Sequence, residues 1–168
     1  LAGKPLIAWA IEQARAVSSI RRIIVSTDSK EIASIATEYG AEVPFMRPKE
    51  LAQDNSPEWK SWRHALRYLQ KSEGKLPDAM VSLPTTAPLR LVMDIENCLT
   101  VFSEGDCDAV ITMTEAHRSP WYNMVKMRED GTVGLIIPSN GEIFRRQDVP
   151  TVYDVTTVAY VMDPLFVL

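Results

Sequence analysis

The chain has 168 residues and a net charge of −4, with 46% hydrophobic and 24% charged residues. This length suffices for one α/β domain with its own core, and the composition is ordinary for a globular protein. No apolar run reaches membrane-spanning length, no signal peptide opens the sequence, and the acidic balance argues against a nucleic-acid partner. We expect a cytoplasmic protein that binds neither membrane nor nucleic acid, with Cys98 and Cys107 as free thiols.

Helical and strand patterns alternate along the first two thirds of the chain. Apolar residues at three- and four-residue spacing predict helices, and short β-branched runs predict strands. The expected helices are 5–17, 30–39, 57–69 and 91–102, and the expected strands are 23–26, 43–45, 79–83 and 109–113. This alternation predicts an α/β fold with a doubly wound, mainly parallel sheet. Ligands of such sheets bind beyond the carboxyl ends of the strands.

Several residues indicate where helices begin and end. Pro5 is expected at the first helical position, and Ser29 is expected to cap the second helix. Gly40 is suited to follow that helix in a left-handed conformation. The third helix begins at Pro57, and its apolar side is expected to hold Trp59, Trp62, Ala65, Leu66 and Leu69.

The pattern changes after residue 115. Two short strands, at 124–127 and 132–136, flank Glu129-Asp130-Gly131, which is a hairpin signal. A β-branched strand returns at 156–162. This excursion suggests a lid or a dimer contact. The chain opens at Leu1 in a turn, and residues 163–166 begin a new element, so we expect one domain over 1–168 that is truncated at both ends.

The loop after the expected strand 43–45 carries Arg47, whose guanidinium can grip a phosphate or carboxylate bidentately. The alternative is a solvated arginine steadied by Glu50. Ser56, at the end of this loop, either lines a ligand pocket or caps the helix that begins at Pro57. Both residues are candidates for ligand binding.

The turn after strand 79–83 carries Thr85, Thr86 and Arg90. Its hydroxyls and backbone amides can approach a base or a phosphate closely. The alternative is a rigid turn that only launches the following helix, with Arg90 paired to Asp94 one helical turn away.

Arg145 and Arg146 form the strongest local charge feature and precede Gln147. Two adjacent arginines in an acidic domain suggest binding of a polyanion, such as the pyrophosphate leaving group of a nucleotidyl transfer. Composition supports an exposed basic turn without a ligand equally well. The sequence contains no motif for covalent catalysis and no glycine-rich phosphate loop, and it shows no evident cluster of acidic metal ligands.

Six ordered segments resemble one known family. They are LAGKPLI (1–7), IVSTDS with EIA (24–33), YGAEVPF (39–45), RP with ELA (47–52), TAPLR (86–90), and RRQD with Pro150 and Tyr153 (145–153). Together they span nearly the whole chain at compatible spacing and are similar to the acylneuraminate cytidylyltransferases. The resemblance implies a nucleotide-diphospho-sugar transferase-like fold, with a dimerisation excursion at residues 116–146 built around the hairpin 121–137.

The resemblance implies attack of a nonulosonic acid on CTP, with release of pyrophosphate and assistance from Mg²⁺. Carried over, Arg145 and Arg146 would be catalytic and would act on the phosphates and the incoming sugar. The nucleotide and substrate would also be contacted by Arg47, Ser56, Thr85, Thr86, Arg90, Gln147 and Thr156. No metal ligand is assigned, because the family's triphosphate loop and acidic metal motif would lie outside the segment 1–168. The implied partners are CTP, a nonulosonic acid and a second copy of the chain.

Two departures from the family pattern concern the sugar and the base. The usual glutamine of the proline–threonine turn is missing at Leu83 and Pro84, and an Asn-Gly-Ala stretch is replaced by residues 156–158 (TTV). These departures leave the sugar open. A transferase for another sugar, such as 3-deoxy-octulosonate, and a non-catalytic nucleotide-binding module remain as alternatives.

Overall fold

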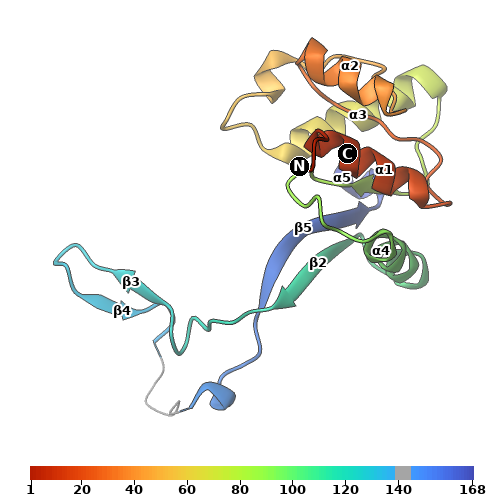
Figure 1. Ribbon diagram of the computed structural model, residues 1–168. Helices are drawn as coiled ribbons and strands as arrows, with labels where there is room; N and C mark the ends of the chain where they lie inside the picture. The colour runs from red at the N-terminus through yellow and green to blue at the C-terminus, as the bar shows by residue number, and fades with distance from the viewer. Residues whose placement is uncertain (139–144) are drawn as a thin grey trace. The chain divides into compact units, whose positions relative to one another are not determined.

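The computed structural model describes residues 1–138 and 145–168 and mixes helices with two small sheets (Figure 1). The helices are α1 (Leu6–Ala16), α2 (Lys30–Glu38), α3 (Glu58–Glu73), α4 (Val92–Glu104) and α5 (Pro164–Val167), with 3-10 turns η1 (Lys49–Leu51) and η2 (Arg146–Asp148). The strands are β1 (Met80–Ser82), β2 (Ala109–Glu115), β3 (Val125–Met127), β4 (Val133–Leu135) and β5 (Tyr153–Met162). The chain divides into a core unit, Leu1–Thr112 with Thr157–Leu168, and an excursion unit, Met113–Thr156.

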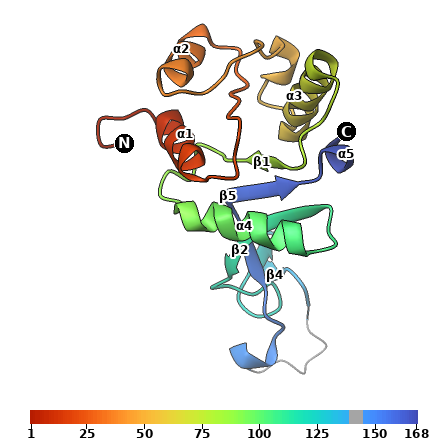
Figure 2. The ribbon, with the colours of Figure 1, turned by 90° about the vertical axis from the view of Figure 1, so that its right-hand side faces the viewer.

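The sheet of the core unit has the order β1-β5-β2, and α4 lies alongside it (Figure 2). Successive residues of β5 face opposite sides of the sheet, as the strand pleat requires. Ala159 and Val161 pack against Cys98 and its neighbours on α4. On the other side, Met162 packs with Leu66 of α3. The sheet is therefore covered by helices on both faces, and the expected α/β class is confirmed.

The pairing of β1 with β5 departs from the expectation of a mainly parallel sheet. These strands run antiparallel, with Met80 opposite Met162 and Ser82 opposite Tyr160. Parallel neighbours need a crossover connection, usually a helix. The chain enters β5 from the segment 113–156 and not from such a crossover, so β5 can run antiparallel to β1.

Helices α1 and α2 pack on a short parallel contact between two extended segments. Ile24 and Glu42 form an isolated bridge, held by hydrogen bonds from Val25 N to Glu42 O (2.9 Å) and from Glu42 N to Ile23 O (2.7 Å). The predicted strands 23–26 and 43–45 are thus reduced to one bridged pair. Their apolar side chains still pack around Ile11 of α1. The sequence therefore predicted which side chains are buried better than it predicted the hydrogen-bonded pairing of the strands.

The helix boundaries follow the sequence signals with two exceptions. Ser29 caps α2 by accepting a hydrogen bond from Ile32 N, and Gly40 follows the helix at φ +91°, both as predicted. Pro57, not Ser56, is the N-cap residue of α3, and no side chain caps that end. Pro5 likewise stands at the N-cap of α1, one residue before its expected position.

Trp59 does not lie on the buried side of α3, where it was expected. Its exposed fraction is 44%, and the guanidinium of Arg63 lies over its ring at 4.7 Å. Leu66 and Leu69 are buried as predicted. Trp59 is in the first turn of the helix, where its ring extends beyond the core and is covered by the arginine instead.

Arg22 joins three parts of the core unit through two carboxylates. Its guanidinium donates to Glu42 at 3.0 and 2.6 Å and also pairs with Glu73 at the end of α3. The hydrogen bond from Arg22 holds the pKa of Glu42 below its ordinary value. A depressed folded-state pKa adds stability above the unfolded pKa, and this stability is lost as the pH falls through the folded value.

We therefore expect Arg22→Met to destabilise the protein at pH 7 by at most about 1 kcal/mol, because both partners are partly exposed. The difference from wild type should shrink as the pH drops below about 4.3, the ordinary pKa of glutamate. Urea denaturation of both proteins at pH 7 and pH 3 measures it. An equal difference at the two pH values would contradict a charge-based contribution.

The excursion unit contains the expected hairpin, which falls within residues 116–146. β3 and β4 pair antiparallel, with Val125 opposite Leu135 and Met127 opposite Val133. Gly131 takes φ +80° at the turn, as the sequence predicted.

Within residues 1–138 and 145–168, every helix is too short or too polar to span a lipid bilayer.

Candidate functional site

Arg47 lies where the two bridged segments of the core unit end. Its backbone N–H donates to Thr27 O at 2.8 Å, which joins the segment after Ile24 to the segment after Glu42. Its guanidinium donates through Nε to Ser26 Oγ at 3.1 Å and through Nη2 to Ser26 O. Both segments run in the same direction here, so their carboxyl ends adjoin, as the expected ligand-binding edge requires.

The alternative in which Glu50 steadies Arg47 is wrong. The hydrogen-bond partner of the guanidinium is Ser26, and the carbonyl of Glu50 accepts from Ser56 Oγ at 2.7 Å. The predicted capping role of Ser56 is also wrong. Its hydroxyl donates to the carbonyl of Glu50 and closes the loop 50–56, and it does not accept from a helix N–H. Two of the five guanidinium donors of Arg47 are used on Ser26, which leaves three for a ligand.

The turn after β1 is closed by its own backbone and tied to β5. Ala87 N donates to Pro84 O at 3.4 Å, and Arg90 N donates to Ala87 O at 3.3 Å. The hydroxyl of Thr86 donates to Thr157 Oγ1 at 3.3 Å, while Thr85 is half-buried beside it. The turn and the TTV stretch, where the chain departs from the family pattern, thus lie in contact.

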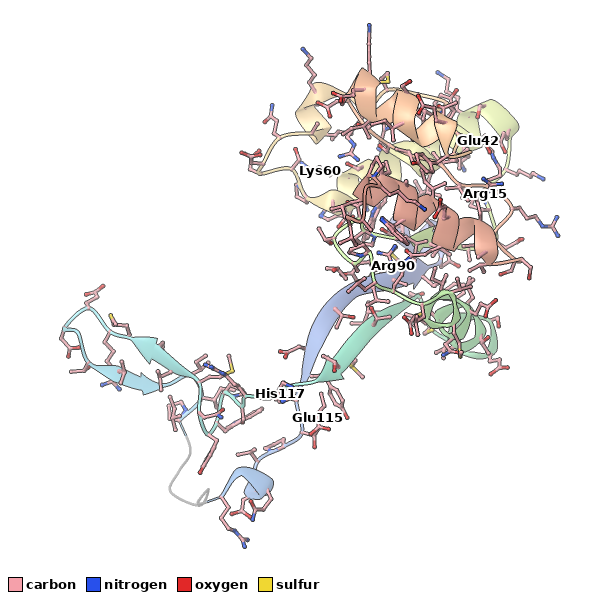
Figure 3. All side chains as sticks on the ribbon, viewed as in Figure 1. Arg15, Glu42, Lys60, Arg90, Glu115 and His117 are labelled. Carbon is pink, nitrogen blue, oxygen red and sulfur yellow. The ribbon has the colours of Figure 1, made fainter. Side chains whose placement is uncertain are left out.

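Arg90 is the most deeply buried of the candidate residues whose side chains are described, with an exposed fraction of 5% (Figure 3). It donates through Nη2 to Pro84 O and through Nη1 to Gln13 Oε1 at 3.4 Å. Burial lowers the pKa of its guanidinium, and the nearby charge of Asp94 opposes this shift. Asp94 forms no salt bridge with it, because the carboxylate caps α4 by accepting from Leu91 N at 2.8 Å. The predicted pairing of Arg90 with Asp94 is therefore wrong.

Two residues around these candidates were missed by the sequence analysis. Ser26 holds the guanidinium of Arg47, and Gln13 of α1 donates to Pro88 O at 2.9 Å and to Arg90 O at 3.0 Å. A signal for Gln13 exists in the helix pattern. It lies between Ala10 and Val17 at helical spacing, so it is a polar residue in an otherwise buried stripe.

The late candidates lie in the excursion unit. Arg145 binds Asp148 bidentately, at 3.1 Å from Nε and 2.9 Å from Nη2, and its backbone N–H also donates to that carboxylate. Arg146 begins η2, but its side chain lies outside the described part of the structure. Gln147 lines an open hollow of about 350 Å³ together with Arg118, and Thr156 is half-buried in β5.

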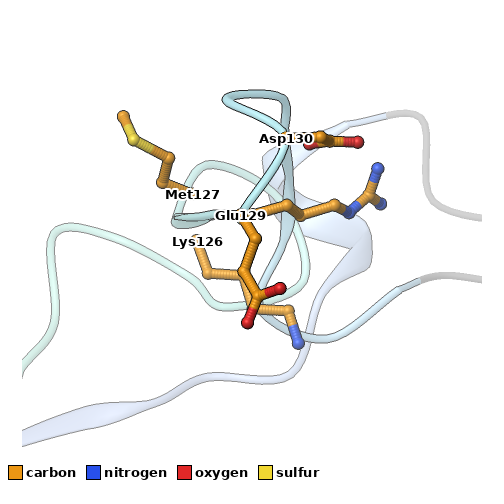
Figure 4. A pocket seen from close by; sticks show the side chains of 5 residues that line it. Lys126, Met127, Glu129 and Asp130 are labelled. Atoms are coloured by element: carbon orange, nitrogen blue, oxygen red, sulfur yellow. The ribbon is translucent and has the colours of Figure 1, made fainter.

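A second hollow surrounds the hairpin turn but has no features of a site. It is lined by Lys126 to Asp130, and Figure 4 shows Met127 pointing away from Lys126 and Glu129. The carboxylate of Asp130 accepts from the backbone and hydroxyl of Thr132, which lowers the pKa of Asp130. These groups stabilise the turn itself.

No group of three or more histidine, cysteine or acidic side chains gathers within metal-binding distance among residues 1–138 and 145–168. Both cysteines are free, with Cys98 buried and Cys107 exposed. Burial raises the pKa of the Cys98 thiol, which keeps it protonated near neutral pH. Cys98 is therefore not an activated nucleophile.

Comparison with known structures identifies the fold. A CMP:2-keto-3-deoxy-manno-octonic acid synthetase complexed with CTP matches 99% of this chain and 66% of its own, with a TM-score of 0.66 and 15% identity. The 4-diphosphocytidyl-2C-methyl-D-erythritol synthase of Anaerococcus prevotii matches 99% and 63%, with a TM-score of 0.65 and 14% identity. Both likenesses show a nucleotidyltransferase-like α/β fold.

Sequence comparison identifies the family. The family model described as cytidylyltransferase matches residues 1–57. Post-translational flagellin modification protein B of Campylobacter coli is 34% identical over 97% of this chain, and a CMP-N,N'-diacetyllegionaminic acid synthase of Campylobacter jejuni is 33% identical over 93%. An N-acylneuraminate cytidylyltransferase of Streptococcus agalactiae is 28% identical over 91%. The chain spans 68%, 65% and 36% of these three relatives. It belongs to the acylneuraminate cytidylyltransferase family.

Proposed function

We propose that this chain transfers the cytidylyl group of CTP to a nonulosonic acid of the sialic, legionaminic or pseudaminic type. The hydroxyl oxygen at the anomeric carbon bonds to the α-phosphorus, the bond from that phosphorus to the bridging oxygen breaks, and pyrophosphate leaves. The hydroxyl proton passes to a base or to solvent. The observation that carries the proposal is the 33% identity, over 93% of the chain, with a protein named for making a CMP-linked legionaminic acid.

The proposed reaction relies on positioning and charge. Arg47 binds the nucleotide through the donors that Ser26 leaves free, and Thr85 and Thr86 face the base or the sugar. Arg146 and Gln147 act on the phosphates and the sugar acid, and Arg145 holds η2 through its ion pair with Asp148. The proposal assigns none of these groups a nucleophilic role, in keeping with direct transfer between two bound substrates.

Mg²⁺ is part of the proposed reaction, where it would offset charge on the triphosphate. The described residues contain no cluster of three or more histidine, cysteine or acidic side chains, so none of them is assigned as its ligand. The roles assigned to the arginines above are therefore derived without the cation. We place the reaction in the cytoplasm, where CTP is formed.

The proposal is tested by measuring pyrophosphate release from CTP, ATP, GTP and UTP with each of several nonulosonic acids. We expect release only with CTP and a nonulosonic acid. Preference for ATP or GTP would overturn the cytidylyl assignment. Preference for 3-deoxy-octulosonate would favour the alternative sugar, and tight CTP binding without release would favour a non-catalytic module.

The proposed enzyme is a homodimer formed through the excursion unit. One face of the hairpin is apolar: Val125, Met127 and Val133 are 56%, 78% and 56% exposed, and the strand register places them on the same side. Exposed apolar groups of this size on a two-stranded sheet favour burial against another surface. A second copy of the chain is the partner that the resemblance implies.

We expect Met127→Lys combined with Val133→Lys to convert the dimer to a monomer, because two charges would be buried at the contact. Lys126→Ala changes the opposite face of the same strand and should leave the dimer intact. Light scattering at working concentration measures both. A monomeric wild-type protein would contradict the dimer proposal.

A further inference from the structure

The side-chain amide of Gln13 joins α1 to the turn that follows β1. Its Nε2 donates to two carbonyls of that turn, Pro88 O at 2.9 Å and Arg90 O at 3.0 Å. Its Oε1 accepts from Arg90 Nη1 at 3.4 Å. Since one end of the amide donates and the other accepts, its orientation is fixed. Gln13 therefore ties the late part of the turn to α1.

Arg90 binds the early part of the same turn through its guanidinium. Its Nη2 donates to Pro84 O, the carbonyl that also accepts from Ala87 N. Gln13 and Arg90 thus bind both ends of the five-residue stretch 84–88, and Thr85 and Thr86 lie between these anchors. The hydroxyl of Thr86 adds a third anchor through Thr157.

This arrangement is costly in free energy. Arg90 is 95% buried by residue surface, it forms no ion pair, and its Nε has no hydrogen-bond partner in the structure. A guanidinium in such surroundings costs more than an apolar side chain of similar size. Buried polar networks of this kind specify one backbone geometry, which is useful where a turn must present its groups to a ligand.

We propose that Gln13 and Arg90 are positioning residues, which fix the Pro84–Pro88 turn so that Thr85 and Thr86 are held ready for the substrate. This proposal rests on the proposed function of the turn and deepens it. It changes the role predicted for Arg90, which is 5% exposed and whose guanidinium acts on the turn, not on the ligand. It also adds Gln13, on a different helix, to the residues on which catalysis depends.

The test uses Gln13→Met, which keeps the length of the side chain and removes every hydrogen bond. We expect kcat/KM for the sugar acid to fall 10- to 100-fold, the cost of a small misplacement of reacting groups. Gln70→Met is the matched control, because Gln70 is an exposed glutamine on α3, and it should stay within twofold of wild type. A decrease below threefold in folded Gln13→Met would overturn the proposal.

Arg90→Lys separates positioning from direct charge. Lysine keeps the charge but lacks the planar fork, so we expect a loss similar to that of Gln13→Met. The double variant should lose little more than either single variant, because both act through one turn. Near-normal activity of Arg90→Lys, or losses that multiply in the double variant, would contradict a shared positioning role.

Hydrogen exchange gives a readout that does not depend on turnover. In Gln13→Met the amides of Ala87 and Arg90, which close the turn, should exchange at least tenfold faster, while α3 amides keep their protection. Unchanged exchange at both amides would overturn the proposal. If wild-type protein releases no pyrophosphate from CTP, the proposed function fails, and exchange still decides whether Gln13 holds the turn.

Discussion

Arg47→Ala is expected to lower kcat/KM for CTP about 100-fold, which corresponds to about 2.7 kcal/mol of transition-state binding. The substitution removes the donors available to the nucleotide and also the two hydrogen bonds to Ser26. Hydrogen bonds to charged groups contribute about 1.5–3 kcal/mol each, so the loss of one phosphate contact accounts for the effect. Steady-state kinetics with varied CTP measures it.

Arg21→Ala is the matched control for charge, because Arg21 is exposed just before the first bridged segment. It should leave kcat/KM within about twofold of wild type, as expected for a screened surface charge. Ser26→Ala removes one partner of Arg47 and should cost less than Arg47→Ala. If Arg47→Ala lowers only the melting temperature and leaves CTP kinetics unchanged, Arg47 serves to join the two segments and does not bind the nucleotide.

Local signals were sufficient for most elements of the fold. Ser29 and Gly40 mark the ends of α2 because a cap and a left-handed glycine act on residues three or four positions away. Gly131 marks the hairpin in the same way. The strand lengths were less predictable, because a ladder depends on how far two segments stay aligned. Ile24 and Glu42 stay aligned for one pair only.

The candidate site was predicted as a set of positions but not as a set of contacts. Arg47 and the turn at Thr85 and Thr86 were found because both follow segments that the sequence predicts to be strands. Their partners were not found, since Ser26 precedes Arg47 by 21 residues and Gln13 precedes Arg90 by 77. Sequence spacing does not encode such tertiary contacts. A polar residue in a buried helical stripe, as at Gln13, is the clearest signal that was available.

The two adjacent arginines were predicted to act together, and the ion pair of Arg145 with Asp148 argues for different roles. Arg145 is bound bidentately by Asp148 within the same turn, which balances its charge locally. A guanidinium held in this way stabilises the backbone of η2. We propose that the charge that offsets a developing pyrophosphate comes from Arg146, whose backbone begins η2.

We therefore expect Arg146→Ala to lower kcat by two or more orders of magnitude, about 2.7 kcal/mol or more, with little change in the free energy of unfolding. Arg145→Ala should lower kcat by less than tenfold and should resemble Asp148→Asn, because both break the same ion pair. Single-turnover rates and urea denaturation of the three variants measure these effects. Near-normal turnover of Arg146→Ala would reduce the pair to a surface turn, and a larger loss in Arg145→Ala would reverse the two roles.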